Sequence, residues 1–329
     1  MKKILPHFFS RGDFIDLFHL IRLKGLKFIL QNFSLINKDR VRSKWNQIEC
    51  SDSDFWIIPE VKREWNKKCT GEPEVEYEDY VVEKYLRNLS GLKMLSVGCG
   101  NSSHEQTFSK HPCFDSVEGI DISEKQLIKA RYYAEEDNCK KVTYRVHDFE
   151  KESLPENEYD VVLFHSSLHH FKSIENIISE RTIPILKKNG LLIIFDYTGP
   201  NRLQWTSEQL NKSNELLRRI PRHRRFRPQS NFLVKKRVYR PGKFRMWVSD
   251  PSEAIDSEAM LETLARHLNV LEEKKLGGNL IHPLLKGIAH HFIDNSAETM
   301  NLLNTFFKEE ELFLKNNSSD FTFGIYRKK

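Results

Sequence analysis

The stretch Met94-Leu95-Ser96-Val97-Gly98-Cys99-Gly100 decides the fold. An apolar run that turns directly into two closely spaced glycines is typical of a strand leading into a tight loop and then a helix. Glycine lets such a loop approach a ligand closely and direct backbone N–H groups at it. A second run, Val117 to Ile120, ends at Asp121, about 20 residues further on, where a carboxylate can accept both hydroxyls of a ribose. The two elements together predict a nucleoside site.

A third element follows the next predicted strand, Val142 to Val146. There, His147-Asp148-Phe149 combines an acid, which can accept from the exocyclic amine of adenine, with an apolar face for a purine. Further strands are predicted at Val161 to Phe164 and Leu191 to Phe195, with helices between them. One of these helices begins at the capping box Ser123 to Gln126, directly after Asp121. Such alternation favours a parallel sheet built from β-α-β units, in which the three loops meet at one crevice.

These motifs resemble those of class I S-adenosylmethionine-dependent methyltransferases. The residues that carry the resemblance are Leu95 to Asn101, Gly119 to Ser123, His147 to Phe149 and Tyr159 to Val162. The resemblance covers residues 75–200 and extends to Phe321 to Tyr326, which is similar to the reversed seventh strand of that fold. It implies an α/β, Rossmann-like, doubly wound sheet of seven strands in the order 3-2-1-4-5-7-6, with strand 7 antiparallel. It also implies S-adenosylmethionine as the cofactor.

The resemblance places Gly98 and Gly100 beside the methionine moiety, Asp121 on the ribose, and Asp148 with Phe149 at the adenine. Two positions depart from the family pattern. Ser96 stands where an acidic residue is usual, and Ser102 where a third glycine is common. A nicotinamide dinucleotide is the alternative ligand, but it calls for glycine at the position of Ser103. The full set of cofactor candidates is Gly98, Cys99, Gly100, Asn101, Asp121, Ile122, Gln126, Asp148, Phe149, His165 and Ser166.

The chain divides into three predicted parts. Residues 1–74 form an N-terminal helical extension, which ends at the breaker cluster Thr70 to Pro73. Residues 75–200 and 265–329 form the methyltransferase core, and 201–264 a basic lid inserted between strands 5 and 6. Within the extension, Phe14 to Ile36 predicts a helix that basic residues interrupt too often for a membrane span. It either docks on its own domain or lies on a membrane surface.

Composition indicates a folded, cytoplasmic protein. Hydrophobic residues make up 39% and charged residues 30% of the 329 residues, which are ordinary globular proportions. The five cysteines are odd in number and have no Cys-x-x-Cys pairing, so neither a disulfide framework nor a zinc site is indicated. The N-terminus carries no signal-peptide pattern. No metal is expected, because the histidines lack carboxylate partners at ligand spacing.

The predicted reaction centre is the segment His165-Ser166-Ser167-Leu168-His169-His170-Phe171, which follows the fourth strand. Methyl transfer depends mainly on holding the acceptor in line with the activated carbon, and a base is needed only when the acceptor must lose a proton. Histidine suits that role, so the catalytic candidates are His169 and His170, with Tyr197 in the loop after strand 5. In the alternative interpretation, one histidine only hydrogen-bonds the backbone or the cofactor, and Gly199-Pro200 simply makes a turn.

A cationic segment offers the main clue to the acceptor. Twelve arginines and lysines lie between Arg218 and Arg245, and this stretch contains no acid. The segment binds a small anion, tracks a nucleic-acid backbone, lies on anionic lipid, or forms a solvated face of a helical lid. His282 is either part of the site or a packing histidine. The acceptor-binding candidates are Asp196, Arg202, Trp205, Arg240, Trp247 and His282.

The sequence therefore predicts an S-adenosylmethionine-dependent methyltransferase acting on an oxygen or nitrogen atom of a small anionic or sugar-linked metabolite. An RNA methyltransferase that uses the basic segment is the second hypothesis, although no RNA-binding module such as the K/R-G-F/Y-G/A-F pattern is present. A third is a non-catalytic, cofactor-binding partner subunit, which the two serine departures would suit. The identity of the acceptor stays open, as does the choice between a monomer and a homodimer.

Overall fold

The computed structural model describes residues 54–329 except 102 and 231, together with 8, 10, 12–15 and 18; the side chains of 247–249 are not described. The predicted helix Phe14 to Ile36 lies largely outside these residues. Ser102 and the side chain of Trp247 also lie outside them. Among the described helices, none is both long enough and apolar enough to cross a bilayer.

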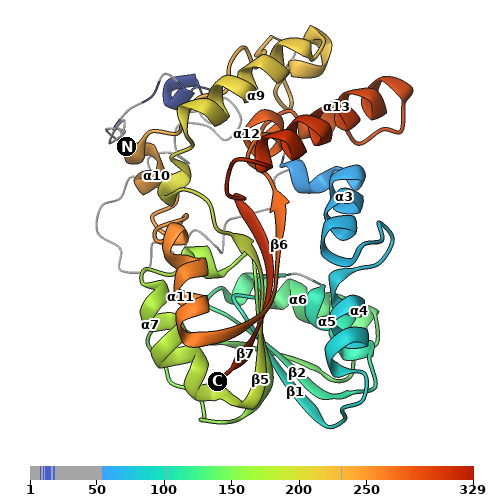
Figure 1. Ribbon diagram of the computed structural model, residues 1–329, viewed down its shortest axis with the longest axis vertical. Coiled ribbons are helices and arrows are strands. Elements are labelled where there is room, and N and C mark those ends of the chain that lie inside the picture. The colour runs from blue at the N-terminus through green and yellow to red at the C-terminus, as the bar shows by residue number, and fades with distance from the viewer. Residues whose placement is uncertain are drawn as a thin grey trace.

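A seven-stranded sheet forms the centre of the molecule (Figure 1). Its order is β3-β2-β1-β4-β5-β7-β6, which confirms the predicted topology. β7 pairs antiparallel with both β5 and β6, whereas the pairs among β1 to β5 are parallel. The strands are β1 Leu92–Val97, β2 Phe114–Asp121, β3 Val142–Val146, β4 Tyr159–His165, β5 Leu186–Tyr197, β6 Leu268–Gly277 and β7 Phe321–Lys328.

Both faces of the sheet are buried, which explains why its central strands read as continuous apolar runs. In β4, Val161 and Leu163 enter one core cluster while Val162 and Phe164 enter another on the opposite face, because successive side chains alternate. Figure 1 shows α7 and α11 against one face and α4 and α5 against the other. The covering helices are α5 His104–Lys110, α6 Glu124–Glu136, α7 Ile174–Asn176, η4 Ile177–Thr182, α8 Ile183–Ile185, η7 Ser257–Ala259 and α11 Met260–His267.

The described part of the N-terminal extension packs on the sheet through aromatic side chains. The ring of Trp65 lies 5.7 Å from that of Phe195 in β5 and 5.1 Å from that of Phe321 in β7. Trp65 belongs to the helix Pro59–Thr70 and is 2% exposed, so this helix is anchored in the main core. The elements of this part are η1 Phe55–Ile57 and α3 Pro59–Thr70, and α4 Tyr77–Val81 and η2 Val82–Leu86 follow at the start of the core.

A layer of helices stacks on one end of the sheet, at the top of Figure 1. α12 packs against both α9 and α13, so the layer combines the insert between β5 and β6 with residues between β6 and β7. We therefore propose to count residues 281–314 with the helical layer when the chain is divided. Its elements are η5 Asn201–Leu203, α9 Ser207–Arg219, η6 Arg222–Arg225, α10 Lys243–Ser249, α12 Ile281–Leu285, η8 Ala289–His291 and α13 Ala297–Leu314.

Candidate active site

The glycine loop follows β1 and has two different requirements for glycine. Gly98 has φ +67°, and a Cβ there would lie 2.8 Å from Cβ of Ser167, so a side chain would collide with the turn after β4. Gly100 has φ +58°, but a Cβ there would meet nothing within 4 Å. The loop is thus packed on one side and open on the other, where a ligand can approach the backbone. Cys99 is buried among Leu127, Ala130 and Tyr144, which leaves only its backbone beside the opening.

Asp121 joins the first two loops. Its Oδ2 accepts a hydrogen bond of 2.9 Å from the Gly100 N–H, and its Oδ1 accepts one of 2.7 Å from the Ser123 N–H. The Ile122 N–H also acts on this carboxylate. A carboxylate has about four acceptor sites, so Asp121 keeps capacity for a further donor. The Ser123 side chain also caps α6, as the sequence predicts. Asp121 therefore lies at the edge of the glycine loop and has acceptor capacity for a ribose.

The loop after β3 lies beside Asp121. The N–H of His147 donates to the carbonyl of Asp121 at 3.0 Å, so the loops after β1, β2 and β3 are linked in series. Asp148 is partly exposed and pairs with Lys151. Phe149 is 4% exposed and packs edge-on against Phe164, within the core. The structure thus brings the three loops to one edge of the sheet, with the Phe149 ring directed into the core.

The remaining cofactor candidates occupy different surroundings. Asn101 is exposed and Ile122 is partly exposed, both beside the crevice, whereas Gln126 is buried in the first turn of α6. His165 ends β4, where its Nδ1 lies 3.1 Å from the hydroxyl of Tyr77. Its ring is stacked 4.9 Å from that of Phe195. His165 therefore belongs to a packed cluster under α4, while Ser166 lines the neighbouring pocket described below.

The turn after β4 is built around Asp196, the fully buried carboxylate near the end of β5. Its Oδ2 accepts from the N–H groups of Ser167 and Leu168 at 2.9 and 2.7 Å, and its Oδ1 lies 2.5 Å from Nδ1 of His169. Ser166 has φ +49°, a strained conformation for a residue other than glycine. The Ser167 hydroxyl donates to the carbonyl of Val97 at 2.6 Å. Asp196 thus fixes both the turn and the His169 ring, and the turn itself rests on the end of β1.

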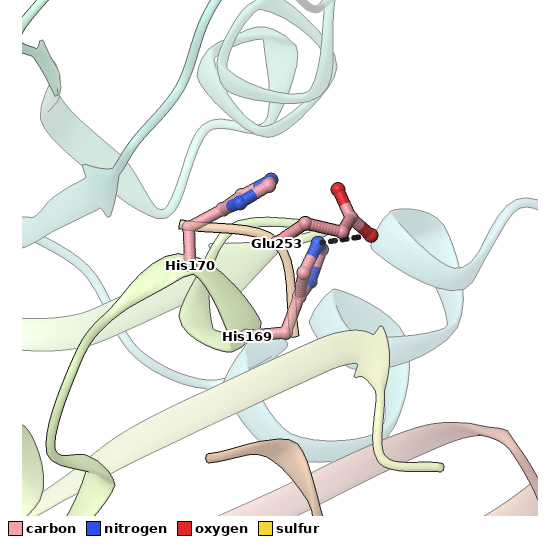
Figure 2. A group of neighbouring side chains, drawn as sticks. All are labelled: His169, His170 and Glu253. Atoms are coloured by element: carbon pink, nitrogen blue, oxygen red, sulfur yellow. Dashed lines mark ion pairs between the residues drawn. The ribbon is translucent and has the colours of Figure 1, made fainter. Parts of the chain in front are cut away.

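The Nε2 edge of the His169 ring points toward Glu253 (Figure 2). The distance from His169 Nε2 to Glu253 Oε1 is 3.9 Å. Burial lowers the pKa of His169, but the charge and hydrogen bond of Asp196, helped by Glu253 and Asp250, outweigh it and raise this pKa to about 9. An imidazole held in this way by a buried carboxylate can take a proton at Nε2 and keep it as a stabilised imidazolium.

His170 differs from His169 although the two are adjacent. Burial lowers the pKa of His170 to about 4, and the charge of His169 lowers it further. Its Nδ1 lies 3.4 Å from the Ser252 hydroxyl. One ligand atom from each of His169, His170 and Glu253 lies within 4.8 Å of the other two (Figure 2). Sequence spacing gave no sign of this carboxylate partner, because Glu253 comes from the distant insert.

A cavity of about 340 Å³ lies next to these residues. Aromatic side chains from three parts of the chain form much of its wall, namely Phe55, Trp56, Tyr197 and Phe321. The charged lining is mixed: Asp54, Asp250 and Glu253 lie with Arg245, Lys286 and the ring of His169. Burial is the main cause that raises the pKa of Asp54. The cavity is therefore an aromatic pocket with a mixed polar lining that includes three carboxylates.

Two further pocket residues are neutral. Tyr197 donates its hydroxyl proton to the carbonyl of Pro200 at 3.1 Å, and burial holds its pKa well above the usual range. It is thus a poor candidate for accepting a proton. Burial lowers the pKa of His282 well below its usual value, and its buried Nδ1 has no hydrogen-bond partner among the described residues. His282 therefore offers one ring nitrogen to a molecule in the cavity.

Residues 88–273 match a family described as a methyltransferase domain, and this match covers more than half of the chain. The chain belongs to this methyltransferase family. The order of the seven strands agrees with that assignment. The observation that decides it is the match itself, which includes the glycine loop, Asp121 and the turn that holds His169.

Individual relatives match about a third of this chain. The ubiquinone biosynthesis O-methyltransferase of Pelagibacter ubique is 29% identical over 116 residues, which are 35% of this chain and 46% of that protein. A sterol 24-C-methyltransferase of Gibberella zeae is 31% identical over 108 residues, 32% of this chain and 28% of that protein. The chain thus spans less than half the length of these curated relatives.

A solved structure extends the likeness to most of the chain. Phosphoethanolamine N-methyltransferase 2 of Haemonchus contortus, in complex with S-adenosyl-L-methionine, aligns with a TM-score of 0.52 and 15% identity. The alignment covers 90% of this chain and 60% of that one. At this identity the likeness is one of fold.

Several cations of this methyltransferase's basic segment, Arg218 to Arg245, donate hydrogen bonds to backbone carbonyls of the protein itself. Arg240 donates its Nε proton to the carbonyl of Trp205 at 2.7 Å, and Lys235 donates to three backbone carbonyls of residues 283–286. Trp205 is 3% exposed and packs edge-on against His282, beneath the pocket. Arg202 donates to the carbonyls of residues 250, 251 and 253. Arg202 and Arg240 therefore hold the insert between β5 and β6 together, and Arg202 positions the loop that carries Glu253.

Arg224 gives a direct test of this structural role. Its side chain is 8% exposed by residue and donates to Glu298, to Thr299 and to the carbonyl of His291. We expect R224A to lower the free energy of unfolding by about 3 kcal/mol, because it leaves the hydrogen-bond partners of Arg224 without their donor. R222A, which removes an exposed arginine of the same short helix, should change it by less than about 0.5 kcal/mol. Urea unfolding followed by circular dichroism measures both, and equal small effects would contradict the structural role.

The functional residues that sequence reasoning missed are mostly acidic. Asp54, Asp250 and Glu253 carry no motif, and each reaches the site from a segment remote from the turn after β4. The Asp-Pro pair Asp250-Pro251 marks a turn, which was the available signal that this loop has a defined shape. Phe55 and Trp56 follow the same pattern, since an aromatic pair in a helical extension gives no indication of a pocket wall.

Proposed function

We propose that this protein transfers a methyl group from S-adenosylmethionine to a hydroxyl oxygen of a small, polyhydroxylated metabolite such as a sugar-linked intermediate. The observation that carries the proposal is the His169–Asp196 pair, whose Nε2 edge lines the pocket. The pair sits on the turn that also contacts Gly98 and Val97. Acceptor and cofactor sites would therefore meet at this turn.

The crevice has features that suit the cofactor. Gly100 leaves open space against the backbone, and Asp121 has acceptor capacity left for a ribose hydroxyl. Asp148 in the next loop is partly exposed and can accept from the adenine amine. When bound, S-adenosylmethionine supplies a methyl carbon that its sulfonium has already activated. This chain's task is then to hold the acceptor oxygen in line and to manage its proton.

His169 is the residue that we assign to that proton. The acceptor hydroxyl would donate to Nε2 and lose its proton to the ring as the oxygen attacks the methyl carbon. Asp196 would keep Nδ1 protonated and stabilise the resulting imidazolium. Glu253, 3.9 Å from Nε2, adds a second negative charge near the ring. The acceleration expected from such a positioned base is about 10²–10⁴-fold.

The pocket lining supports the sugar-linked class of acceptor rather than the anionic one. Three carboxylates, Asp54, Asp250 and Glu253, can accept hydrogen bonds from hydroxyls, and they offset the positive charge of Arg245 and Lys286 that would attract a phosphate or carboxylate. The aromatic walls can pack against the apolar faces of a ring. The neutral His282 can bind a further hydroxyl. An N-methylated amine would fit the same carboxylates, and the identity of the product separates it from an ether.

Labelling gives the test of the proposal. The full chain is incubated with methyl-labelled S-adenosylmethionine and size-fractionated cell extract. We expect label in the small-molecule fraction, in an alkali-stable methyl ether. Label in RNA would overturn the proposal in favour of the nucleic-acid hypothesis, which also predicts steeply salt-dependent RNA binding. Absence of label from every fraction, with the cofactor bound, would favour a non-catalytic subunit.

A further inference from the structure

A buried acidic cluster lies outside the pocket, under α4. Glu78 is 3% exposed, and its Oε1 lies 2.5 Å from Nδ1 of His104. The second oxygen, Oε2, is also buried, and it has no hydrogen-bond partner among the described residues. A buried carboxylate oxygen without a donor is costly, so its retention calls for a partner that is absent from the protein itself.

The cluster is next to the glycine loop. His104 is the first residue of α5, directly after that loop, and its ring stacks 3.6 Å from His165 at the end of β4. Tyr77, the neighbour of Glu78, lies 3.1 Å from His165 through its hydroxyl. Glu78 is thus held between the loops that follow β1 and β4. Asp121 and Asp148 follow β2 and β3, so Glu78 lies further along the same edge, toward the middle of the sheet.

The surroundings of His104 decide what Glu78 can bind. Burial lowers the pKa of His104, but the hydrogen bond and charge of Glu78 and the charge of Glu105 outweigh it and raise this pKa. His104 faces only one oxygen of Glu78, Oε1. Lys62, which also acts on His104, is exposed and pairs with Glu76 at 2.7 Å. The second oxygen, Oε2, is therefore open to a donor from a ligand, and a positively charged donor makes the strongest hydrogen bond to a carboxylate.

We propose that Glu78 Oε2 binds the α-ammonium group at the methionine end of S-adenosylmethionine. This inference rests on the proposed function only in the identity of the cofactor. The adenosine end of that cofactor is neutral and suits Asp121 and Asp148, whereas its positive groups lie at the other end of the molecule. Ser96, at the end of β1, is 1% exposed and carries no charge to meet them. Glu78, in the helix α4 that precedes the first strand, would then supply the negative charge that Ser96 in β1 lacks.

Calorimetric binding of two cofactor fragments tests the proposal without turnover. The ligands are S-adenosylhomocysteine, which has the α-ammonium, and 5′-methylthioadenosine, which lacks the whole amino-acid part. We expect E78Q to weaken the binding of S-adenosylhomocysteine by about tenfold to a hundredfold, which is the range for a charge-assisted hydrogen bond. Binding of 5′-methylthioadenosine should change by less than about twofold, since the nucleoside loops are untouched.

The control is D79N, the same change of charge on the next residue of α4. Asp79 is exposed and faces His111 at 2.9 Å, so D79N should leave both affinities unchanged. The proposal would be overturned if E78Q lowered the affinity for both ligands equally, or lowered the affinity for neither. Failure of the wild-type chain to bind either ligand would instead contradict the proposed function.

A change to the ligand tests the proposal independently, even if the E78Q variant does not fold. An analogue of S-adenosylhomocysteine with hydrogen in place of the amino group is titrated into the wild-type chain. We expect it to bind about tenfold to a hundredfold more weakly than S-adenosylhomocysteine itself. Equal affinity of the two would show that the ammonium finds no anionic partner, and would overturn the role of Glu78.

Discussion

We expect H169Q to reduce methyl transfer to the acceptor fraction by about 10²–10⁴-fold. Glutamine removes the group that takes the acceptor proton, while the Asp196 bonds to the backbone of residues 167 and 168 can persist. The cofactor loops should therefore stay in place. The measurement is the initial rate of label incorporation at saturating S-adenosylmethionine, alongside the affinity for S-adenosylhomocysteine, which should change by less than about twofold.

The pH dependence distinguishes a base from a positioning residue. The neutral imidazole is the active form, and the pKa of His169 is about 9 in the absence of acceptor. Below this pKa most of the ring is already protonated, so the rate should rise about tenfold per pH unit from pH 7 and level off near pH 9. D196N removes the largest cause that raises this pKa, so its inflection should move to lower pH.

His170 serves as the internal control for this profile. Its pKa of about 4 lies outside the range that is scanned, so H170Q should keep the inflection near pH 9. A wild-type rate that is flat between pH 7 and pH 9 would exclude His169 as the proton acceptor. So would an H169Q variant whose rate stays within about threefold of the wild type.

The second large effect concerns Asp121. We expect D121A to weaken the binding of both S-adenosylhomocysteine and 5′-methylthioadenosine by about a hundredfold, because the carboxylate contact to the ribose is lost. The variant also removes the bonds that join Gly100 to Ser123, while Gly98 and Cys99 still donate to the carbonyl of Ile120 in β2. Isothermal titration calorimetry measures both affinities.

D137N is the matched control for D121A, because Asp137 ends α6 at the surface and pairs with Lys110 at 3.5 Å. It should leave both affinities unchanged. The contrast with E78Q is the sharper test: D121A should affect both ligands, and E78Q only the one with an ammonium group. Retention of tight nucleoside binding in D121A would mean that the nucleoside lies elsewhere on the sheet.

The sheet could be predicted from sequence because its signals are local. Each strand is a short apolar run, and the loops with Gly98, Asp121 and His147 come directly after strands, so chain order places them on one edge. The seventh strand followed from the resemblance, and its antiparallel pairing with β5 is confirmed. His169 was also accessible, because it lies just after a strand whose end had already been assigned.

The acidic half of the site was not accessible in the same way. Glu253, Asp250 and Asp54 reach the pocket through tertiary packing of the insert and the N-terminal helices, and no local pattern encodes that proximity. The basic segment was difficult to interpret for a related reason. A run of cations suggests an anion site, but Arg224, Lys235 and Arg240 are buried and bind the protein's own oxygens. Charge in a sequence does not show whether its partner is a ligand or a carbonyl.

The way in which Arg202 holds the loop of residues 250–253 has a consequence for how acceptor preference can change. Its guanidinium binds the loop at residues 250, 251 and 253 through main-chain carbonyls, which every amino acid possesses. The Asp250 side chain also accepts from the Ser252 N–H, so position 250 is part of the loop's own structure. Position 253 can be exchanged while these contacts persist, and mutagenesis there would retune selectivity on an otherwise unchanged backbone.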